Sequence, residues 1–242
     1  MNVPFFLYRR LARWITCEIR LSPNQILKLS DKYEVASFQD VFCNPFYWQV
    51  FKYLRSSQNL IIDCGAHCGH FSILVETCLQ HKYSSLNIDS RYILVEPNPF
   101  LVKNLTKNMH DAQIKNFKIL KGLLGKNSSG FGTLWINHTN YLSASLSPSQ
   151  NTRPYQVPYI NLHKEVLDRT VDILKLDIEG GEYEFIESHL DLLEKTQTLF
   201  IEIHPHPNYS LNHIFQSLEQ AGLYQAEEAI QCSVNKLIVF KR

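Results

Sequence analysis

The residues best suited to chemistry are Asp63-Cys-Gly65-Ala66-His67-Cys-Gly69, which follow the apolar residues 60–62. A carboxylate at the end of a buried strand, followed by a small-residue turn into a helix, is how α/β sheets form nucleotide pockets. The run lacks the middle glycine of G-x-G-x-x-G, and His67 stands in its place. Because that glycine lets the backbone approach a pyrophosphate, its absence favours a ligand without pyrophosphate, such as S-adenosylmethionine.

A second carboxylate, Glu96, ends the apolar run 92–95 and precedes Pro97-Asn98. A carboxylate at the end of the second strand can accept two hydrogen bonds from a ribose diol. Its position therefore predicts that the pocket binds a nucleoside.

Further polar side chains lie on two later apolar runs, at Lys175, Asp177, Glu179, Glu202 and His204. Adjacent parallel strands would bring these groups into one cleft at the carboxyl edge of a sheet. Carboxylates, a lysine and a histidine in a cleft are candidates for acid–base chemistry or for binding a substrate hydroxyl.

The elements that must position these residues alternate along the chain. Strand-length apolar runs alternate with segments of helical periodicity, which predicts an α/β fold with a mostly parallel sheet and helices on both faces. Strands are expected at 60–63, 92–96, 117–120, 171–177, 199–204 and 237–240, and helices at 71–80, 101–109, 183–193 and 211–221.

Two segments interrupt this alternation. Residues 1–50, rich in aromatics towards their end, are expected to form a helical cap or lid that belongs to the same unit as the domain at 51–242. Residues 122–160 are expected to be a long loop that contains a strand or hairpin and covers the ligand cleft, since long loops on such sheets are usually functional.

Four motifs in consistent order resemble the FkbM-type methyltransferases, which bind S-adenosylmethionine in a Rossmann-like class I fold. Lys175-Leu-Asp-Ile-Glu-Gly-Gly-Glu182 resembles their K-x-D-x-E-G-x-E signature, and residues 63–69 resemble their D-x-G-A-N-x-G loop. Glu96-Pro-Asn-Pro99 resembles their E-P-x-P turn, and Glu202-Ile-His204 their E-I-H strand. The resemblance covers about 55–205, and it departs at His67, where the family has asparagine.

The resemblance implies S-adenosylmethionine as cofactor and an O-methyltransferase that acts on a hydroxyl of a small acceptor such as a sugar or natural product. It also implies cofactor-binding residues at three strand ends. The methionine side would be lined by Asp63, Gly65, Ala66, His67 and Gly69, the ribose held by Glu96 with Pro97 and Asn98 beside it, and the adenine approached by Gly122 and Leu123.

By the same resemblance, Asp177, Glu179 and His204 would face the acceptor hydroxyl. Such a hydroxyl needs a general base or a metal that lowers its pKa. His204 is the first candidate base because the ordinary pKa of histidine is nearest to neutral, and Asp177 is the second. Lys175 either stabilises a developing alkoxide or pairs with a carboxylate.

Composition limits the partners. The net charge of +1 does not suggest a polyanion, so no nucleic-acid partner is expected. No metal is assigned: a divalent cation at Asp177, His204 and His206 is possible but not predicted. The oligomeric state stays open.

The compartment is inferred from the cysteines and from the first residues. The six cysteines form no C-x-x-C pair and two lie in the ligand loop, which favours reduced thiols and a cytoplasmic location. Residues 1–20 mix aromatics with arginines and contain no membrane-spanning run. They are interpreted as an amphipathic helix packed on the domain, with membrane-surface contact as the weaker alternative.

Two other functions stay open on the sequence alone. One is a methyltransferase that acts on RNA or protein, which a basic patch on the cap or on the 122–160 loop would support. The other is a non-catalytic module that binds S-adenosylmethionine without transferring its methyl group.

Overall fold

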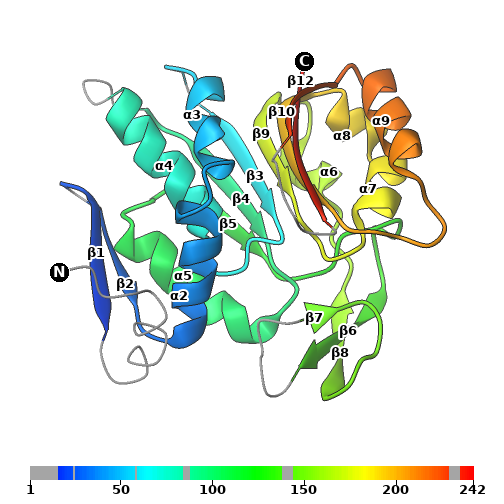
Figure 1. Ribbon diagram of the computed structural model, residues 1–242, viewed down its shortest axis with the longest axis horizontal. Coiled ribbons are helices and arrows are strands. Elements are labelled where there is room, and N and C mark those ends of the chain that lie inside the picture. Colours follow the sequence, from blue (N-terminus) through cyan, green and yellow to red (C-terminus); the bar gives the residue numbers. More distant parts are fainter. Residues whose placement is uncertain (1–15, 24, 58, 84–87, 138–143, 229–234) are drawn as a thin grey trace.

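The computed structural model describes residues 16–23, 25–57, 59–83, 88–137, 144–228 and 235–242. A seven-stranded sheet in the order β11-β12-β10-β9-β3-β4-β5 forms its centre (Figure 1). The five strands from β10 to β5 are parallel, and β12 is antiparallel to both of its neighbours. The strands are β3 (Leu60–Cys64), β4 (Arg91–Val95), β5 (Phe117–Leu120), β9 (Val171–Leu176), β10 (Thr196–Ile203), β11 (Tyr224–Glu228) and β12 (Lys236–Lys241).

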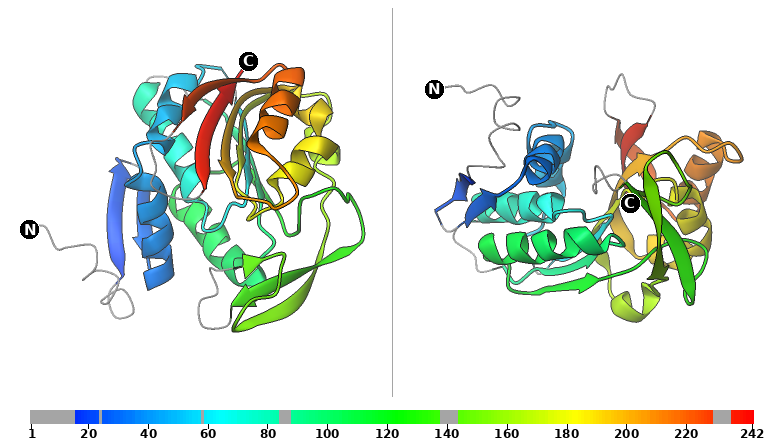
Figure 2. Two further views of the ribbon diagram at one scale, coloured as in Figure 1. Left: turned by 45° about the vertical axis from the view of Figure 1, so that its right-hand side comes forward. Right: turned by 90° about the horizontal axis from the view of Figure 1, so that it is seen from below.

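Helices cover both faces of this sheet, as the alternation of apolar segments predicts (Figures 1 and 2). Successive strand residues point to opposite faces: Ile61 and Ile173 join one apolar core, whereas Ile62 and Leu174 join the other. The first core is closed by α2 (Lys32–Phe42), α3 (Val50–Tyr53), α4 (His70–Lys82) and α5 (Pro99–Asp111), and the second by α6 (His163–Val166), α7 (Glu182–Ser188), α8 (Leu190–Leu193) and α9 (Leu211–Gln220).

The strand order reverses between β3 and β9. From β3 the chain continues outwards through β4 and β5, and it returns to the other side of β3 to form β9 and β10. The carboxyl ends of β3 and β9 therefore lie side by side, where the backbone N–H of Asp177 donates to the carbonyl of Cys64 at 3.1 Å. Ligands of open α/β sheets bind at such a switch point.

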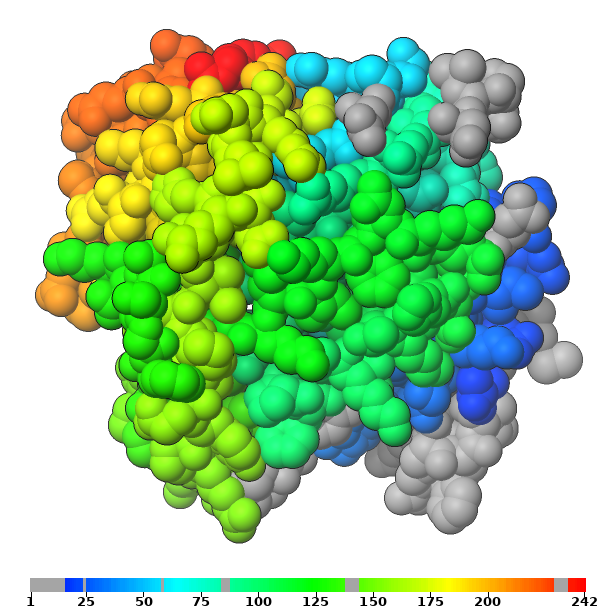
Figure 3. All heavy atoms as spheres, turned by 180° about the vertical axis from the view of Figure 1, so that it is seen from behind, coloured from blue at the N-terminus to red at the C-terminus, as the bar shows by residue number. Residues whose placement is uncertain are grey.

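The segment 122–160 is more ordered than the expected loop. It forms a second, antiparallel sheet in the order β7-β6-β8, from β6 (Phe131–Asn137), β7 (Ala144–Ser145) and β8 (Thr152–Pro158). Leu134, Ile136 and Val157 pack on Leu123 in a small core of their own. In the view from behind, the residues of this small sheet lie at the lower left (Figure 3). An ion pair links β5 to α6, since Lys118 Nζ lies 2.7 Å from Glu165 Oε2.

Among the residues that the structure describes, the amino-terminal segment, expected to be a helical cap or lid, is helical only in its second half. The first described elements are the strands β1 (Cys17–Ser22) and β2 (Gln25–Leu29), which form an antiparallel hairpin. The reason is a period-two pattern: Leu27 and Leu29 are buried while Lys28 between them is exposed. The hairpin packs beside α4 and α5 (Figure 2), and α2 and the 3₁₀ turn η1 (Tyr47–Gln49) follow it towards the carboxyl edge of the sheet.

The interpretation of residues 1–20 as an amphipathic helix falls mostly on residues outside the described part. From Cys17 onwards the chain is a strand. In the described residues, no helix is both long and apolar enough to cross a bilayer.

Candidate functional site

Two pockets open at the carboxyl edge of the sheet and meet at the switch point. The wide pocket has a volume of about 840 Å³ and the narrow one about 100 Å³. Both are lined by Gly65, His67, Asp177 and Glu179. The two pockets are therefore adjacent, with these four residues between them.

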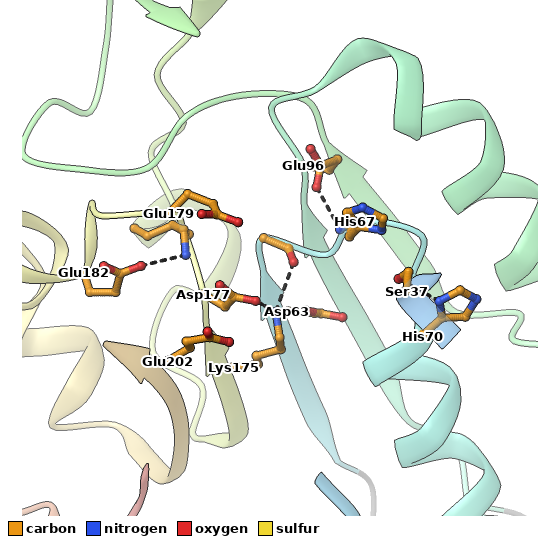
Figure 4. Close-up of polar contacts among 12 residues, drawn as sticks. Ser37, Asp63, His67, His70, Glu96, Lys175, Asp177, Glu179, Glu182 and Glu202 are labelled. Carbon is orange, nitrogen blue, oxygen red and sulfur yellow. Dashed lines mark hydrogen bonds and ion pairs between the residues drawn. The ribbon is translucent and has the colours of Figure 1, made fainter. Parts of the chain in front are cut away.

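The narrow pocket combines one buried carboxylate with apolar walls. Glu96 Oε2 accepts a hydrogen bond from the His67 backbone N–H at 2.7 Å, and its Oε1 accepts one from the Asn98 N–H at 2.8 Å (Figure 4). Burial raises the pKa of Glu96 to about 7. The apolar walls are Val95, Leu101, Leu123, Leu134 and Leu146. A carboxylate with lone pairs to spare beside an apolar slot suits a ribose and a base, so these residues fit a nucleoside.

The turn after β3 is closely packed on the end of β9. Gly65 has φ +75°, and a Cβ placed on it would lie 1.7 Å from the carbonyl oxygen of Asp177. No residue other than glycine fits there without displacing the β9 backbone. The turn therefore fixes how the two motifs meet.

His67 follows in the same turn, with φ 51°. Burial lowers the pKa of His67 to about 4, so its ring is neutral at pH 7. Its Nδ1 is buried and has no hydrogen-bond partner among the described residues. A neutral imidazole ring therefore lines both pockets at the place where they meet.

Lys175 lies beneath this junction, with 5% of its surface exposed. Its Nζ donates to the carbonyl of Gly65 at 3.0 Å and to Asp177 Oδ2 at 3.1 Å, and lies 3.6 Å from Asp63 Oδ1 (Figure 4). Burial works to lower the pKa of Lys175, but the Asp177 and Asp63 carboxylates together outweigh burial and raise it. Of the two roles considered for this lysine, the structure shows the pairing with carboxylates.

The polar cluster above Lys175 centres on His204. Its Nε2 lies 3.5 Å from Glu179 Oε2, and its Nδ1 lies 3.1 Å from Glu182 Oε1. Burial works to lower the pKa of His204, but the hydrogen bond and charge of Glu182, with the charge of Glu179, raise it to about 9. Burial also raises the pKa of both Glu179 and Glu202. In the ligand-free pocket His204 is therefore mainly the imidazolium at pH 7.

The sequence profile of the methyltransferase FkbM domain matches residues 63–223, more than half of the chain. The chain belongs to the FkbM methyltransferase family. It is accordingly an S-adenosylmethionine-dependent methyltransferase, and the resemblance seen in the four motifs is confirmed.

Solved structures similar to this FkbM methyltransferase have low sequence identity to it. The Pyrococcus horikoshii protein PH0793 is 12% identical with a TM-score of 0.50, and the match covers 93% of this chain and 70% of that one. Magnesium protoporphyrin IX methyltransferase from Synechocystis, with bound SAH, is 12% identical with a TM-score of 0.48, over 87% and 85% of the two chains.

An O-methyltransferase family protein from Burkholderia thailandensis is 11% identical with a TM-score of 0.49, over 87% and 59% of the two chains. A sequence search of curated proteins finds no match. The fold is the Rossmann-like class I fold that the sequence predicts.

Not every residue carried over from the family motifs lines a pocket of this FkbM methyltransferase. Asp63 is buried below the pockets, where it accepts a hydrogen bond from Ser72 Oγ at 2.8 Å. Gly69 packs on α5, and a Cβ there would lie 2.7 Å from Leu105 Cδ1. Ala66 lines the wide pocket, whereas Pro97, Asn98, Gly122 and Leu123 line the narrow one.

The sequence did not identify the outer wall of the wide pocket. That wall is formed by Ser37 and Asp40 of α2, Asn44 between α2 and η1, Tyr47 of η1, and Asn235 before β12. The aromatic run around Tyr47 was a signal for it, although aromatic runs more often belong to a core. Tyr47 does both, since it is buried on Phe71 and also lines the pocket.

Proposed function

We propose that this FkbM methyltransferase transfers a methyl group to a hydroxyl of a small, polar, uncharged or cationic acceptor such as a sugar or natural product. The observation that carries the proposal is the meeting of two pockets at four shared residues: a narrow apolar slot that contains the Glu96 carboxylate, and a wide polar pocket. A donor in the first and an acceptor in the second would approach each other there, and such positioning is the main contribution an enzyme makes to methyl transfer.

On this proposal the narrow pocket holds the cofactor. Glu96 accepts hydrogen bonds from the ribose, Gly122 and Leu123 contact the adenine, and Gly65 and His67 contact the methionine part. When bound, S-adenosylmethionine supplies a methyl group on a positively charged sulfur. The carboxylates of Asp177 and Glu179 at the junction favour a cation in that position.

The charge of the wide pocket supports the choice of acceptor. Four carboxylates line it, on Asp40, Asp177, Glu179 and Glu202. Lys175, a cation that also lines this pocket, is already paired with the carboxylates of Asp63 and Asp177. A phosphate backbone would be repelled, so a small hydroxylated acceptor is favoured over RNA.

The acceptor hydroxyl must lose its proton as it takes the methyl group. Asp177, Glu179 and His204 are the side chains we propose to orient it and to promote that loss.

The free thiols of Cys64, Cys68 and Cys78 support the cytoplasm as the compartment, since structural disulfides are rare there.

The test has two separate measurements. Calorimetry with S-adenosylhomocysteine should show binding, and transfer from labelled S-adenosylmethionine should methylate neutral or amino sugars but not the matching sugar phosphates, tRNA or protein. Methylation of tRNA or protein in preference to small acceptors would contradict the proposal. Cofactor binding without transfer to any pool, small or polymeric, would favour a non-catalytic module.

The role given to Glu96 makes cofactor binding dependent on pH. The ionised carboxylate is the form that accepts the ribose hydroxyls, and the pKa of Glu96 is raised to about 7 by burial. The affinity for S-adenosylhomocysteine should therefore be constant above this pH and fall by up to about tenfold per pH unit below it. Binding near pH 7 should release a proton, which calorimetry in buffers of different ionisation enthalpy measures.

The control is Glu96→Gln, which cannot ionise. Its affinity should be lower and should lose this pH dependence between pH 5.5 and 8. The same acidic decline in Glu96→Gln as in the unchanged protein would mean that another group is responsible.

A further inference from the structure

We propose that Asp177, Glu179 and His204 bind a divalent cation such as Mn²⁺ at the junction of the two pockets, where the acceptor hydroxyl also binds. The inference rests on the proposed function, because it assigns a role to the cation in activating that hydroxyl. From the sequence alone, no metal was assigned to this junction, and the possible ligands of a divalent cation were Asp177, His204 and His206.

The ligand atoms of Asp177, Glu179 and His204 are close enough to bind a cation after only small side-chain movements. The ligand atoms of the three side chains all lie within 4.8 Å of one another. In an octahedral site with bonds of about 2.1 Å, neighbouring ligands are about 3 Å apart and opposite ones about 4.2 Å. His204 Nε2 and Glu179 Oε2 are already 3.5 Å apart, and the Glu179 side chain, 64% exposed, is free to close the rest.

Glu182 gives independent support, because it fixes the ring of His204 from behind. Its side chain has no exposed surface, and its Oε1 accepts the backbone N–H of Ile178 at 3.0 Å while lying 3.1 Å from His204 Nδ1. Glu182 keeps the proton on Nδ1, so when the cation displaces the second proton of the imidazolium, Nε2 becomes the ligand atom and faces Glu179. Metal-binding histidines almost always donate their second N–H to a carboxylate, a backbone carbonyl or a water, and Glu182 is such a carboxylate.

The surroundings decide which residues can belong to the site. The His206 ring is tilted against the rings of Tyr183 and Tyr209, with centroid distances of 5.7 Å and 4.8 Å, and it lines neither of the two pockets. Glu179 therefore takes the place of His206 in the ligand set. Two carboxylates with one imidazole suit Mn²⁺ and neighbouring transition metals, and three protein ligands leave coordination positions for the acceptor and water.

The chemical consequence is activation of the acceptor. A cation that binds the acceptor oxygen lowers the pKa of its hydroxyl, and the proton leaves to solvent through the open wide pocket. The oxygen then forms the new bond to the methyl carbon with its electron pair, while the bond from that carbon to sulfur breaks and its electrons remain on sulfur. His204 is then a ligand rather than the base: the cation acts as a Lewis acid, and solvent water accepts the proton.

The experiment titrates the chelator-treated protein with Mn²⁺ and follows free Mn²⁺ by electron paramagnetic resonance, with calorimetry of S-adenosylhomocysteine on the same samples. The unchanged protein should bind one Mn²⁺, and Glu179→Gln should reduce or abolish that binding. Glu182→Gln should weaken it by about 10- to 100-fold, since Glu182 positions the ligand and does not touch the cation.

The matched control is Glu187→Gln, which alters an exposed His213–Glu187 pair of 2.9 Å and should leave Mn²⁺ binding unchanged. Equal Mn²⁺ binding in the unchanged protein and in Glu179→Gln, with normal S-adenosylhomocysteine binding in both, would overturn the cation site and leave the proposed function standing. Loss of S-adenosylhomocysteine binding by the unchanged protein would instead contradict the proposed function.

Discussion

Gly65→Ala is expected to abolish S-adenosylhomocysteine binding and to lower the free energy of unfolding by about 4 kcal/mol or more. The new Cβ would lie 1.7 Å from the carbonyl oxygen of Asp177. That oxygen belongs to the backbone at the end of β9, so the contact can be relieved only by separating the two strand ends. The positive φ of +75° adds strain of its own. Urea unfolding and calorimetry measure the two effects.

Gly130→Ala separates the two causes. Gly130 has a similar φ of +84°, but apart from its chain neighbours no described atom lies within 4 Å of the Cβ position. This variant should lose only about 1 kcal/mol, because backbone strain is its main cost, and it should bind the cofactor product normally. Equal losses in the two variants would show that the contact with Asp177 is unimportant.

The sequence predicted the parts of the site that follow from strand ends. Apolar runs that finish in Asp63, Glu96, Asp177 and Glu202 predict parallel strands whose carboxyl ends share one edge, and the sheet has that arrangement. Strands of a parallel sheet that are buried on both faces read as short, nearly continuous apolar runs. For this reason the fold, and the gathering of these side chains at one edge of the sheet, were predictable.

Contacts between distant segments were not predictable in the same way. The helical pattern of 183–193 is broken at His189, where φ is −130°, into α7 and α8. The buried position of Glu182 and its contact with His204 depend on how α7 packs on β10, which no local pattern records. Likewise, the raised pKa of Glu96 comes from burial, whereas that of His204 comes from the hydrogen bond and charge of Glu182 and the charge of Glu179, which outweigh burial.

Lys175→Met is expected to destabilise the protein by about 3 to 5 kcal/mol, because it leaves two carboxylates without their cation. Asp63 is wholly buried, and its Oδ1 has no hydrogen-bond partner in the described part of the chain, so the charge of Lys175 at 3.6 Å is its main compensation. Cofactor binding should weaken as well, since Nζ also holds the carbonyl of Gly65. Lys195→Met, at an exposed pair with Asp168, is the control and should cost less than about 1 kcal/mol.

The loss in Lys175→Met should grow as the pH rises, and this direction follows from Asp63. Burial already raises the pKa of Asp63, with Lys175 acting against it, so removing the lysine raises this pKa further. A carboxyl whose pKa is higher in the folded state than in the unfolded one loses stability as pH rises above the unfolded value of about 3.9. Urea unfolding at pH 5 and pH 8 should therefore show the larger loss at pH 8.

The double variant Asp63→Asn with Lys175→Met tests whether the two side chains act as a pair. Asparagine keeps an oxygen to accept from Ser72 but carries no charge, so the double variant should be more stable than the sum of the two single losses predicts. It should also lose most of the difference between pH 5 and pH 8. Strictly additive losses would mean that Lys175 supports the site through Asp177 and Gly65 alone, with Asp63 stabilised independently of the lysine.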